Sequence, residues 1–122
     1  MKSKLIYRIS IGLISAMMVF SAYSYFTNPE VVAGFDHLGF PSFFRVELAI
    51  AKLIGVGVLL LPFVPNFLKE WAFAGFIITF ISAFIAHAVN GDPASAFIGP
   101  LLALTLIITA YIYHRKLHSQ TV

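Results

Sequence analysis

The feature that most constrains this chain is a series of four long apolar stretches, which fill most of its 122 residues. They run over residues 9–26, 46–64, 71–89 and 94–113. Crossing a bilayer core takes about 20 residues of helix. None of the stretches alternates between apolar and polar residues, as the strands of a transmembrane barrel do. The sequence therefore predicts an all-α polytopic membrane protein, a four-helix bundle that forms a single transmembrane domain over residues 1–122.

The composition also points to lipid as the surroundings of this chain. Of its residues 60% are hydrophobic and only 11% are charged, and a soluble domain of this size could not bury so much apolar surface. We therefore expect the lipid bilayer as a partner. The formal net charge of +3 is small and lies mainly at the chain ends, where a membrane surface explains it better than a nucleic acid does. Cysteine is absent, which excludes disulfides, thiolate metal sites and a dithiol relay.

The connection after the first stretch carries the signals of a short helix. Asn28, Pro29 and Glu30 are typical of an N-cap, a first-turn proline and a first-turn acid. Gly39 is typical of the end of a helix. The sequence therefore predicts a short interfacial connector over residues 28–44 rather than a span.

The connections on either side of the third stretch are predicted to be tight. Gly91 is expected to end the third helix, and Asp92 is expected to be the structural N-cap of the fourth. Asn66 can cap the third helix at its other end. Within the fourth stretch, Gly99-Pro100 predicts a kink, because proline cannot make the backbone hydrogen bond of a helix interior.

The basic residues predict the orientation, because cytoplasmic loops are rich in lysine and arginine. With four crossings, one side receives Lys2, Lys4, Arg8, Lys69, Arg115 and Lys116. The other side receives the acids Glu30, Asp36 and Asp92. We therefore expect cytoplasmic N- and C-termini and a multi-pass location in the cell membrane, namely a bacterial inner membrane. A cleaved signal peptide is the alternative for the first stretch, but that stretch is longer than a typical signal sequence and has no A-x-A pattern.

Polar side chains inside the spans are the candidates for a site, because charged groups in lipid mark functional sites or buried pairs. Glu47 and Lys52 lie in the second stretch and His87 in the third, all in the outer half of the predicted bilayer. Tyr23 adds a hydroxyl at this level. These four residues are the predicted substrate-binding site. Glu47 and Lys52 diverge by about 140° on an ideal helix, so each is expected to find its partner on another helix, with His87 as the nearest candidate.

Each charged residue of this predicted site also has a structural interpretation. Lys52 can extend along its stem to the outer head groups. Glu47 can interact with the dipole of its helix. His87 can hydrogen-bond a backbone carbonyl or water. Only their convergence on one depth favours a functional interpretation.

Two further groups of residues carry weaker signals. Lys69, Glu70 and Trp71 look like residues of the cytoplasmic interface, where tryptophan is enriched. The histidines lack the spacing of metal ligands, so no metal site is predicted: they are His37, His87, His114 and His118.

The connector and the residues after it resemble the DoxX-like family of small membrane proteins. The resemblance is carried by Leu38-Gly39-Phe40-Pro41, Glu47, Lys52-Leu53-Ile54-Gly55, Pro62, Lys69-Glu70-Trp71-Ala72-Phe73-Ala74-Gly75-Phe76, His87 and Gly91-Asp92. It implies a four-helix membrane protein. It also implies a link to quinones and membrane redox enzymes, because the family takes its name from a subunit associated with a thiosulfate:quinone oxidoreductase.

The resemblance and the polar residues favour a quinone- or lipid-interacting component of a membrane redox system. A quinone is then the expected cofactor, and a membrane oxidoreductase subunit is the expected partner. Lys52 or His87 would donate a hydrogen bond to a quinone carbonyl as its charge develops. The alternative is a non-catalytic scaffold or assembly subunit for a partner protein. Small-solute transport is a weaker third hypothesis, because four spans form a pathway only as a homo-oligomer and no inverted repeat is visible.

Overall fold

The chain is helical over nearly its whole length. The computed structural model describes residues 2–121, and the side chains among them up to residue 117. The described part contains five α-helices and one short 3₁₀-helix: α1 (Lys2–Thr27), α2 (Pro29–His37), α3 (Ser42–Leu60), α4 (Asn66–Val89), η1 (Ala94–Phe97) and α5 (Ile98–Thr121). The all-α prediction is confirmed. The described part has five α-helices rather than the four of the predicted bundle, and the additional one is α2, the short helix expected in the connector.

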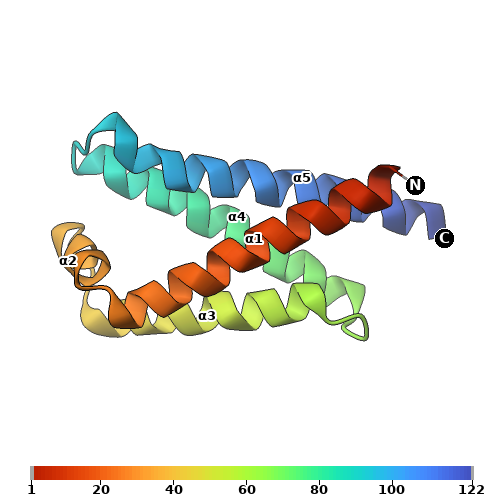
Figure 1. Ribbon diagram of the computed structural model, residues 1–122, viewed down its shortest axis with the longest axis horizontal. Helices are drawn as coiled ribbons and strands as arrows, with labels where there is room; N and C mark the ends of the chain where they lie inside the picture. The colour runs from red at the N-terminus through yellow and green to blue at the C-terminus, as the bar shows by residue number, and fades with distance from the viewer. Residues whose placement is uncertain (1, 122) are drawn as a thin grey trace.

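The four long helices spread apart at the end of the molecule that carries α2, where α1 and α3 lie on one side and α4 and α5 on the other (Figure 1). Helix α1 crosses the molecule diagonally, contacting α5 along one part of its length and α3 along another. The two chain termini and the α3–α4 loop lie at one end, which we name the terminal end. Helix α2 and the turn between α4 and η1 lie at the opposite end, which we name the connector end.

The apolar core lies in the middle and toward the terminal end. Ile14 of α1, Phe73 of α4 and Ile107 of α5 are its largest fully buried side chains. The last buried side chain of α4 is Phe80, and α2 and η1 contribute none. The helices therefore lose their shared core toward the connector end, which explains why they spread apart there.

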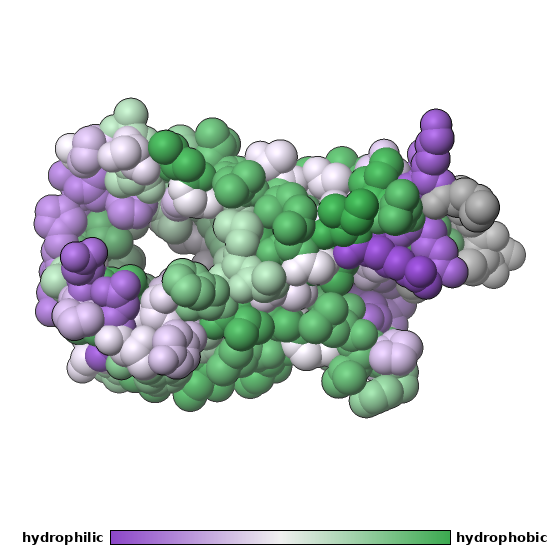
Figure 2. Space-filling view, viewed as in Figure 1, coloured by the Kyte–Doolittle hydropathy of each residue, from purple (hydrophilic) through white to green (hydrophobic). Residues whose placement is uncertain are grey.

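Three helices are long and apolar enough to cross a membrane, counting only the residues that the structure describes. They are Lys2–Thr27, Asn66–Val89 and the combined segment Ala94–Leu117. Helix α3 is long enough but carries Arg45, Glu47 and Lys52 within its 19 residues. Figure 2 shows the hydrophobic side chains gathered along the middle of the molecule, with hydrophilic ones at both ends. These features are those of a helical membrane protein.

Several predicted helix ends are confirmed. The side chain of Asn28 accepts a hydrogen bond of 2.9 Å from the backbone N–H of Glu30, and Pro29 begins α2. Gly39 and Gly91 follow α2 and α4 with positive φ angles of 84° and 66°. An L side chain rarely adopts this left-handed conformation, so glycine favours the turn at both positions.

Two predicted caps are wrong. Pro93 rather than Asp92 precedes η1 in an extended conformation, without a capping side chain, and the carboxylate of Asp92 turns back toward α4. Asn66 is the first residue of α4 and bonds His114 instead of its own backbone. The kink predicted inside the fourth helix at Gly99-Pro100 is also wrong, because η1 ends at Phe97 and α5 begins at Ile98. Pro100 thus lies in the first turn of α5, where no partner for its missing N–H is needed.

Candidate functional site

Lys52 is a buried cation between α1 and α3, with a relative exposure of 6%. Its Nζ donates hydrogen bonds of 2.9 Å to the hydroxyl of Ser21 and 2.5 Å to the hydroxyl of Tyr25. The same nitrogen lies 4.3 Å from the centre of the Tyr25 ring, within range of a cation–π interaction. The side chain of the lysine therefore points toward α1. The interpretation that it extends along its stem to the outer head groups is wrong.

Tyr25 also connects the second cation of α3 to α1. The guanidinium of Arg45 donates a hydrogen bond to the backbone carbonyl of Tyr25. This carbonyl is among the last four of α1, which have no partner within their helix. Phe35 of α2 packs edge-on against the Tyr25 ring, with ring centres 4.7 Å apart. Tyr25 thus contacts both cations of α3 and the Phe35 ring of α2.

Glu47 and Tyr23, predicted to join Lys52, do not. Both side chains are exposed, and Tyr23 is 65% exposed. Glu47 makes no hydrogen bond or ion pair with any residue that the structure describes. The physical reason is rotation about the helix axis: Glu47 is turned about 140° from Lys52, and Tyr23 is turned about 160° from its neighbours Ser21 and Tyr25.

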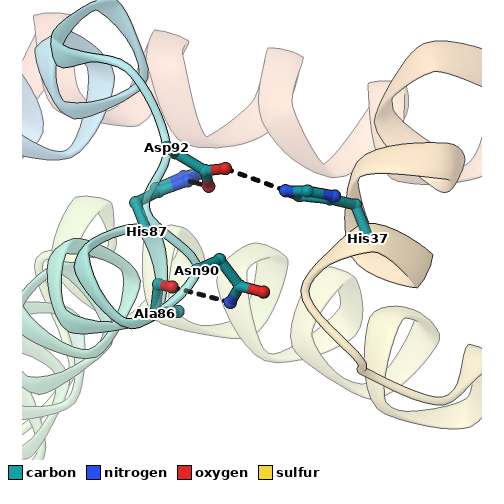
Figure 3. A network of polar contacts seen from close by, with 5 residues as sticks. All are labelled: His37, Ala86, His87, Asn90 and Asp92. Atoms are coloured by element: carbon teal, nitrogen blue, oxygen red, sulfur yellow. Dashed lines mark hydrogen bonds and ion pairs between the residues drawn. The ribbon is translucent and has the colours of Figure 1, made fainter.

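His87 belongs to a separate cluster at the connector end. Its Nδ1 lies 2.7 Å from one carboxylate oxygen of Asp92, and Nε2 of His37 lies 2.8 Å from the other. Figure 3 shows the side chain of His37 pointing from α2 toward Asp92 in the α4–η1 turn, with the side chain of His87 of α4 beside Asp92. We name this three-residue cluster the carboxylate bridge. The predicted contact of His87 with Glu47 or Lys52 is therefore wrong.

The carboxylate bridge spans a real opening. Figure 2 shows a hole in the space-filling surface near the connector end, with hydrophilic residues closing its outer side. Hydrogen bonds from His87 and His37 hold the pKa of Asp92 below its ordinary value of 3.8. A carboxylate with two imidazole partners stays charged in ordinary buffers. The bridge is thus the polar contact that joins α2 to α4 across this opening.

An apolar groove of about 370 Å³ lies between α3 and α4. Its walls combine small residues with larger apolar ones, and Lys52 is the charged residue among them. The α3 wall contains Leu48, Ala51, Lys52, Ile54, Gly55 and Val58, and the α4 wall contains Leu68, Trp71, Ala72, Gly75, Phe76 and Thr79. Ligand pockets in proteins begin at about this volume.

The residues predicted as interfacial have more specific roles. Nζ of Lys69 donates to the backbone carbonyls of Val58, Leu59 and Leu61 at 3.1, 3.1 and 2.9 Å. It therefore caps the end of α3, whose last carbonyls have no helical partner. Trp71 is 69% exposed and lines the groove. The side chain of Glu70 is partly exposed near the terminal end.

Sequence reasoning missed a buried histidine at the terminal end. His114 is 3% exposed, and its Nε2 lies 2.7 Å from the side-chain oxygen of Asn66. Its ring packs against Phe73 and Tyr7, with centres 5.1 and 5.9 Å apart. Ser21 and Tyr25 had a signal in the sequence, because they are four residues apart and so share one helix face. His37 and His114 had no local signal, since their partners are distant in sequence.

Fold and site together define a helical membrane protein with a buried cation beside an apolar groove. No group of three or more ligating side chains able to hold a metal ion occurs within the part of the chain that the structure describes. The model of the DoxX-like family matches residues 9–110, so the chain belongs to this family. Searches of curated proteins and of solved structures found no match to the chain.

Proposed function

We propose that the chain crosses the membrane four times, through α1, α3, α4 and α5, with both termini in the cytoplasm of a bacterial cell and the connector end at the outer face of its inner membrane. The basic residues gathered at the terminal end support this orientation. The cations of α3 are compatible with a span because Lys52 and Arg45 both have partners on α1.

We further propose that the protein binds a membrane-soluble ligand, a quinone or a lipid, in the groove between α3 and α4, as a component of a membrane redox system. The observation that carries this proposal is the groove itself, whose lining is mainly apolar and includes Lys52 as its charged residue. An ammonium group has three N–H donors, and Ser21 and Tyr25 take two of them. The third donor can bond an acceptor on the ligand.

The redox part of the proposal depends on family membership and on a partner. The chain belongs to the DoxX-like family, and the link of that family name to quinone-dependent membrane enzymes is the expectation on which this part rests. Because the chain has no cysteine, it has no thiol relay of its own. We therefore assign the supply of electrons to a partner oxidoreductase, and we assign to this chain the binding and orientation of the ligand.

The test is mass spectrometry of the quinones and lipids that co-purify with the protein in mild detergent. Gly75→Leu places a side chain in the groove, where a Cβ meets no atom within 4 Å. Gly12→Leu is the matched control, because Gly12 is an exposed helical glycine with equally open space outside the groove. We expect a co-purifying ligand in the wild type and in Gly12→Leu, and a loss of about tenfold in Gly75→Leu. Equal ligand content in all three proteins would contradict the proposal.

A second candidate function is supported by Glu47. A carboxylate exposed in a membrane helix without a partner in the described chain is costly. A basic residue of another protein, or of a second copy in a homo-oligomer, would offset this cost. The protein would then be a scaffold or assembly subunit. Cross-linking in native membranes should capture a stoichiometric partner that Glu47→Gln loses, and a monomer without partners in wild-type membranes would refute this candidate.

A further inference from the structure

The positive charges next to the groove have no negative counterpart in the described chain. Lys52 is hydrogen-bonded, but both of its partners are neutral hydroxyls. Arg45, at the other end of Tyr25, bonds a neutral carbonyl. The two ion pairs of the described residues both involve Asp92 and histidines. Two cations therefore flank Tyr25 without a carboxylate to balance either of them.

Hydrogen bonds to neutral groups do not remove the cost of this charge. A buried charge loses several kcal/mol of hydration, and an opposite charge repays that loss only where the geometry of the pair is good. The nearest acid along α3 is Glu47, which is turned away from Lys52 and exposed. The described residues thus supply hydrogen bonds for the ammonium ion of Lys52 but no counter-ion, and a ligand can supply one.

The groove determines what kind of molecule can bring that charge. Its other lining residues are apolar or weakly polar, among them Ile54, Gly55 and Phe76. A small hydrated anion gains nothing from such walls, whereas a hydrocarbon tail does. A ligand that satisfies both features has a negative head at Lys52 and an apolar tail between α3 and α4.

We infer that the groove binds an anionic amphiphile, whose carboxylate or phosphate head pairs with the ammonium group of Lys52 while its tail lies between α3 and α4. This inference rests on the proposed function and narrows it, because a quinone is neutral. Lys52 borders the groove and has one N–H donor beyond the two that bond Ser21 and Tyr25. Arg45, seven residues earlier, adds positive potential from the same face of α3. A fatty acid and an acidic phospholipid are two sources of this chemistry.

The experiment uses the single tryptophan of the chain as its probe, since Trp71 lines the groove. The full-length protein in phosphatidylcholine nanodiscs is titrated with oleate, phosphatidylglycerol, oleyl alcohol, a decyl quinone and inorganic phosphate, and Trp71 emission is recorded. We expect oleate or phosphatidylglycerol to saturate the signal at least tenfold more tightly than oleyl alcohol or the quinone. If only oleate saturates the signal, the ligand is a free fatty acid. If only phosphatidylglycerol does, the ligand is an acidic phospholipid.

The variants test the role of Lys52 directly. Lys52→Gln should weaken oleate binding about tenfold and leave oleyl alcohol unchanged, and Lys52→Arg should retain oleate binding. Lys4→Gln is the control, because it removes one positive charge from an exposed position of α1. The comparison of oleate with oleyl alcohol in the wild type stands even if Lys52→Gln does not fold.

The failures of the two proposals are distinguishable. If the quinone or oleyl alcohol binds as tightly as oleate in the wild type, the proposed ligand site stands and the anionic head is wrong. If inorganic phosphate alone competes with oleate for the signal, the anion site stands without the tail, which also overturns the inference. If no compound changes Trp71 emission, both proposals are refuted.

Discussion

The two ends of this molecule are held together in different ways. At the terminal end α1, α4 and α5 share an apolar core around Phe73, and the buried pair of His114 and Asn66 lies against it. At the connector end α2 and α4 have no shared core, and the carboxylate bridge joins them across an opening. Packing thus stabilises one end, whereas three polar side chains define the geometry of the other. Side-chain substitutions should therefore affect global stability at the first end and local geometry at the second.

The largest expected effect is on the core of the terminal end. Phe73→Ala removes a ring that is 0% exposed, and truncation of a buried phenylalanine costs about 3–5 kcal/mol. Phe84→Ala, in the connector-end half of the same helix, removes a ring that is 40% exposed and should cost much less. Reversible unfolding in mixed micelles measures both free energies. Equal losses would show that the two ends do not differ in packing.

The next effect concerns the close approach of α3 and α4. A Cβ on Gly55 would lie 2.6 Å from Cζ of Phe76, whereas a Cβ on Gly57 meets no atom within 4 Å. Alanine at either position gains helix propensity, but overpacking costs about 1–3 kcal/mol. We expect Gly55→Ala to be less stable than Gly57→Ala by about this amount in the same unfolding assay. If the two variants are equally stable, the Phe76 ring moves aside without cost, and its contact with Gly55 does not restrict the packing of α3 against α4.

A smaller effect separates the two asparagines that flank the ends of α4. Asn66→Ala removes an acceptor from the buried ring of His114 and should cost about 1 kcal/mol, a typical net contribution for a hydrogen bond. Asn90 bonds the backbone carbonyl of Ala86 at the exposed connector end (Figure 3). Asn90→Ala should change the free energy of unfolding by less than Asn66→Ala does. The reverse order would place the stabilising polar contacts at the connector end.

The smallest effect on global stability is expected from the carboxylate bridge, which should instead control a distance. Spin labels at Ala33→Cys in α2 and Ser95→Cys in η1 can be attached selectively, because the chain has no cysteine. Double electron–electron resonance should give a narrow distribution of the distance between the two labels when Asp92 is present, and a broad one after Asp92→Asn. Identical distributions would mean that the bridge does not hold the opening.

The pH dependence of that distance follows from Asp92. Its folded pKa lies below 3.8, so the bridge is complete above this pH and is lost as the pH falls through the lowered value. An imidazole donates an N–H to a carboxylate whether it is neutral or charged. We therefore expect the narrow distribution to persist from neutral pH down to the 3.8 of an ordinary aspartate. Broadening near neutral pH would show that the histidines, rather than the carboxylate, control the bridge.

Local signals in the sequence predicted the helix ends well. Asn28, Gly39 and Gly91 act through their own backbone and nearest neighbours, so their roles do not depend on how helices pack. Asp92 shows the limit of this reasoning. The turn at Gly91 brings its carboxylate back to His87, and the third partner, His37, is 55 residues away in sequence.

The direction in which the site residues face could not be predicted from the sequence. Lys52 and His87 were predicted at one level of the membrane but face different neighbours. The connector-end part of α1 offers several hydroxyls, and only the packing of α1 against α3 selects Ser21 and Tyr25 over Tyr23. Rotation about a helix axis depends on interhelical contacts, which a hydrophobic pattern with little amphipathicity does not specify.

The partners of Lys52 and Arg45 have a consequence for how the chain enters the membrane. Each lysine or arginine at the centre of an isolated helix opposes insertion by about 2.5–3.5 kcal/mol, so α3 is poorly suited to partition into lipid by itself. Helix α1 is synthesised first and carries the hydroxyls and the carbonyl that these cations bond. In the proposed four-span topology, α1 therefore precedes α3 into the membrane with the groups that the α3 cations bond.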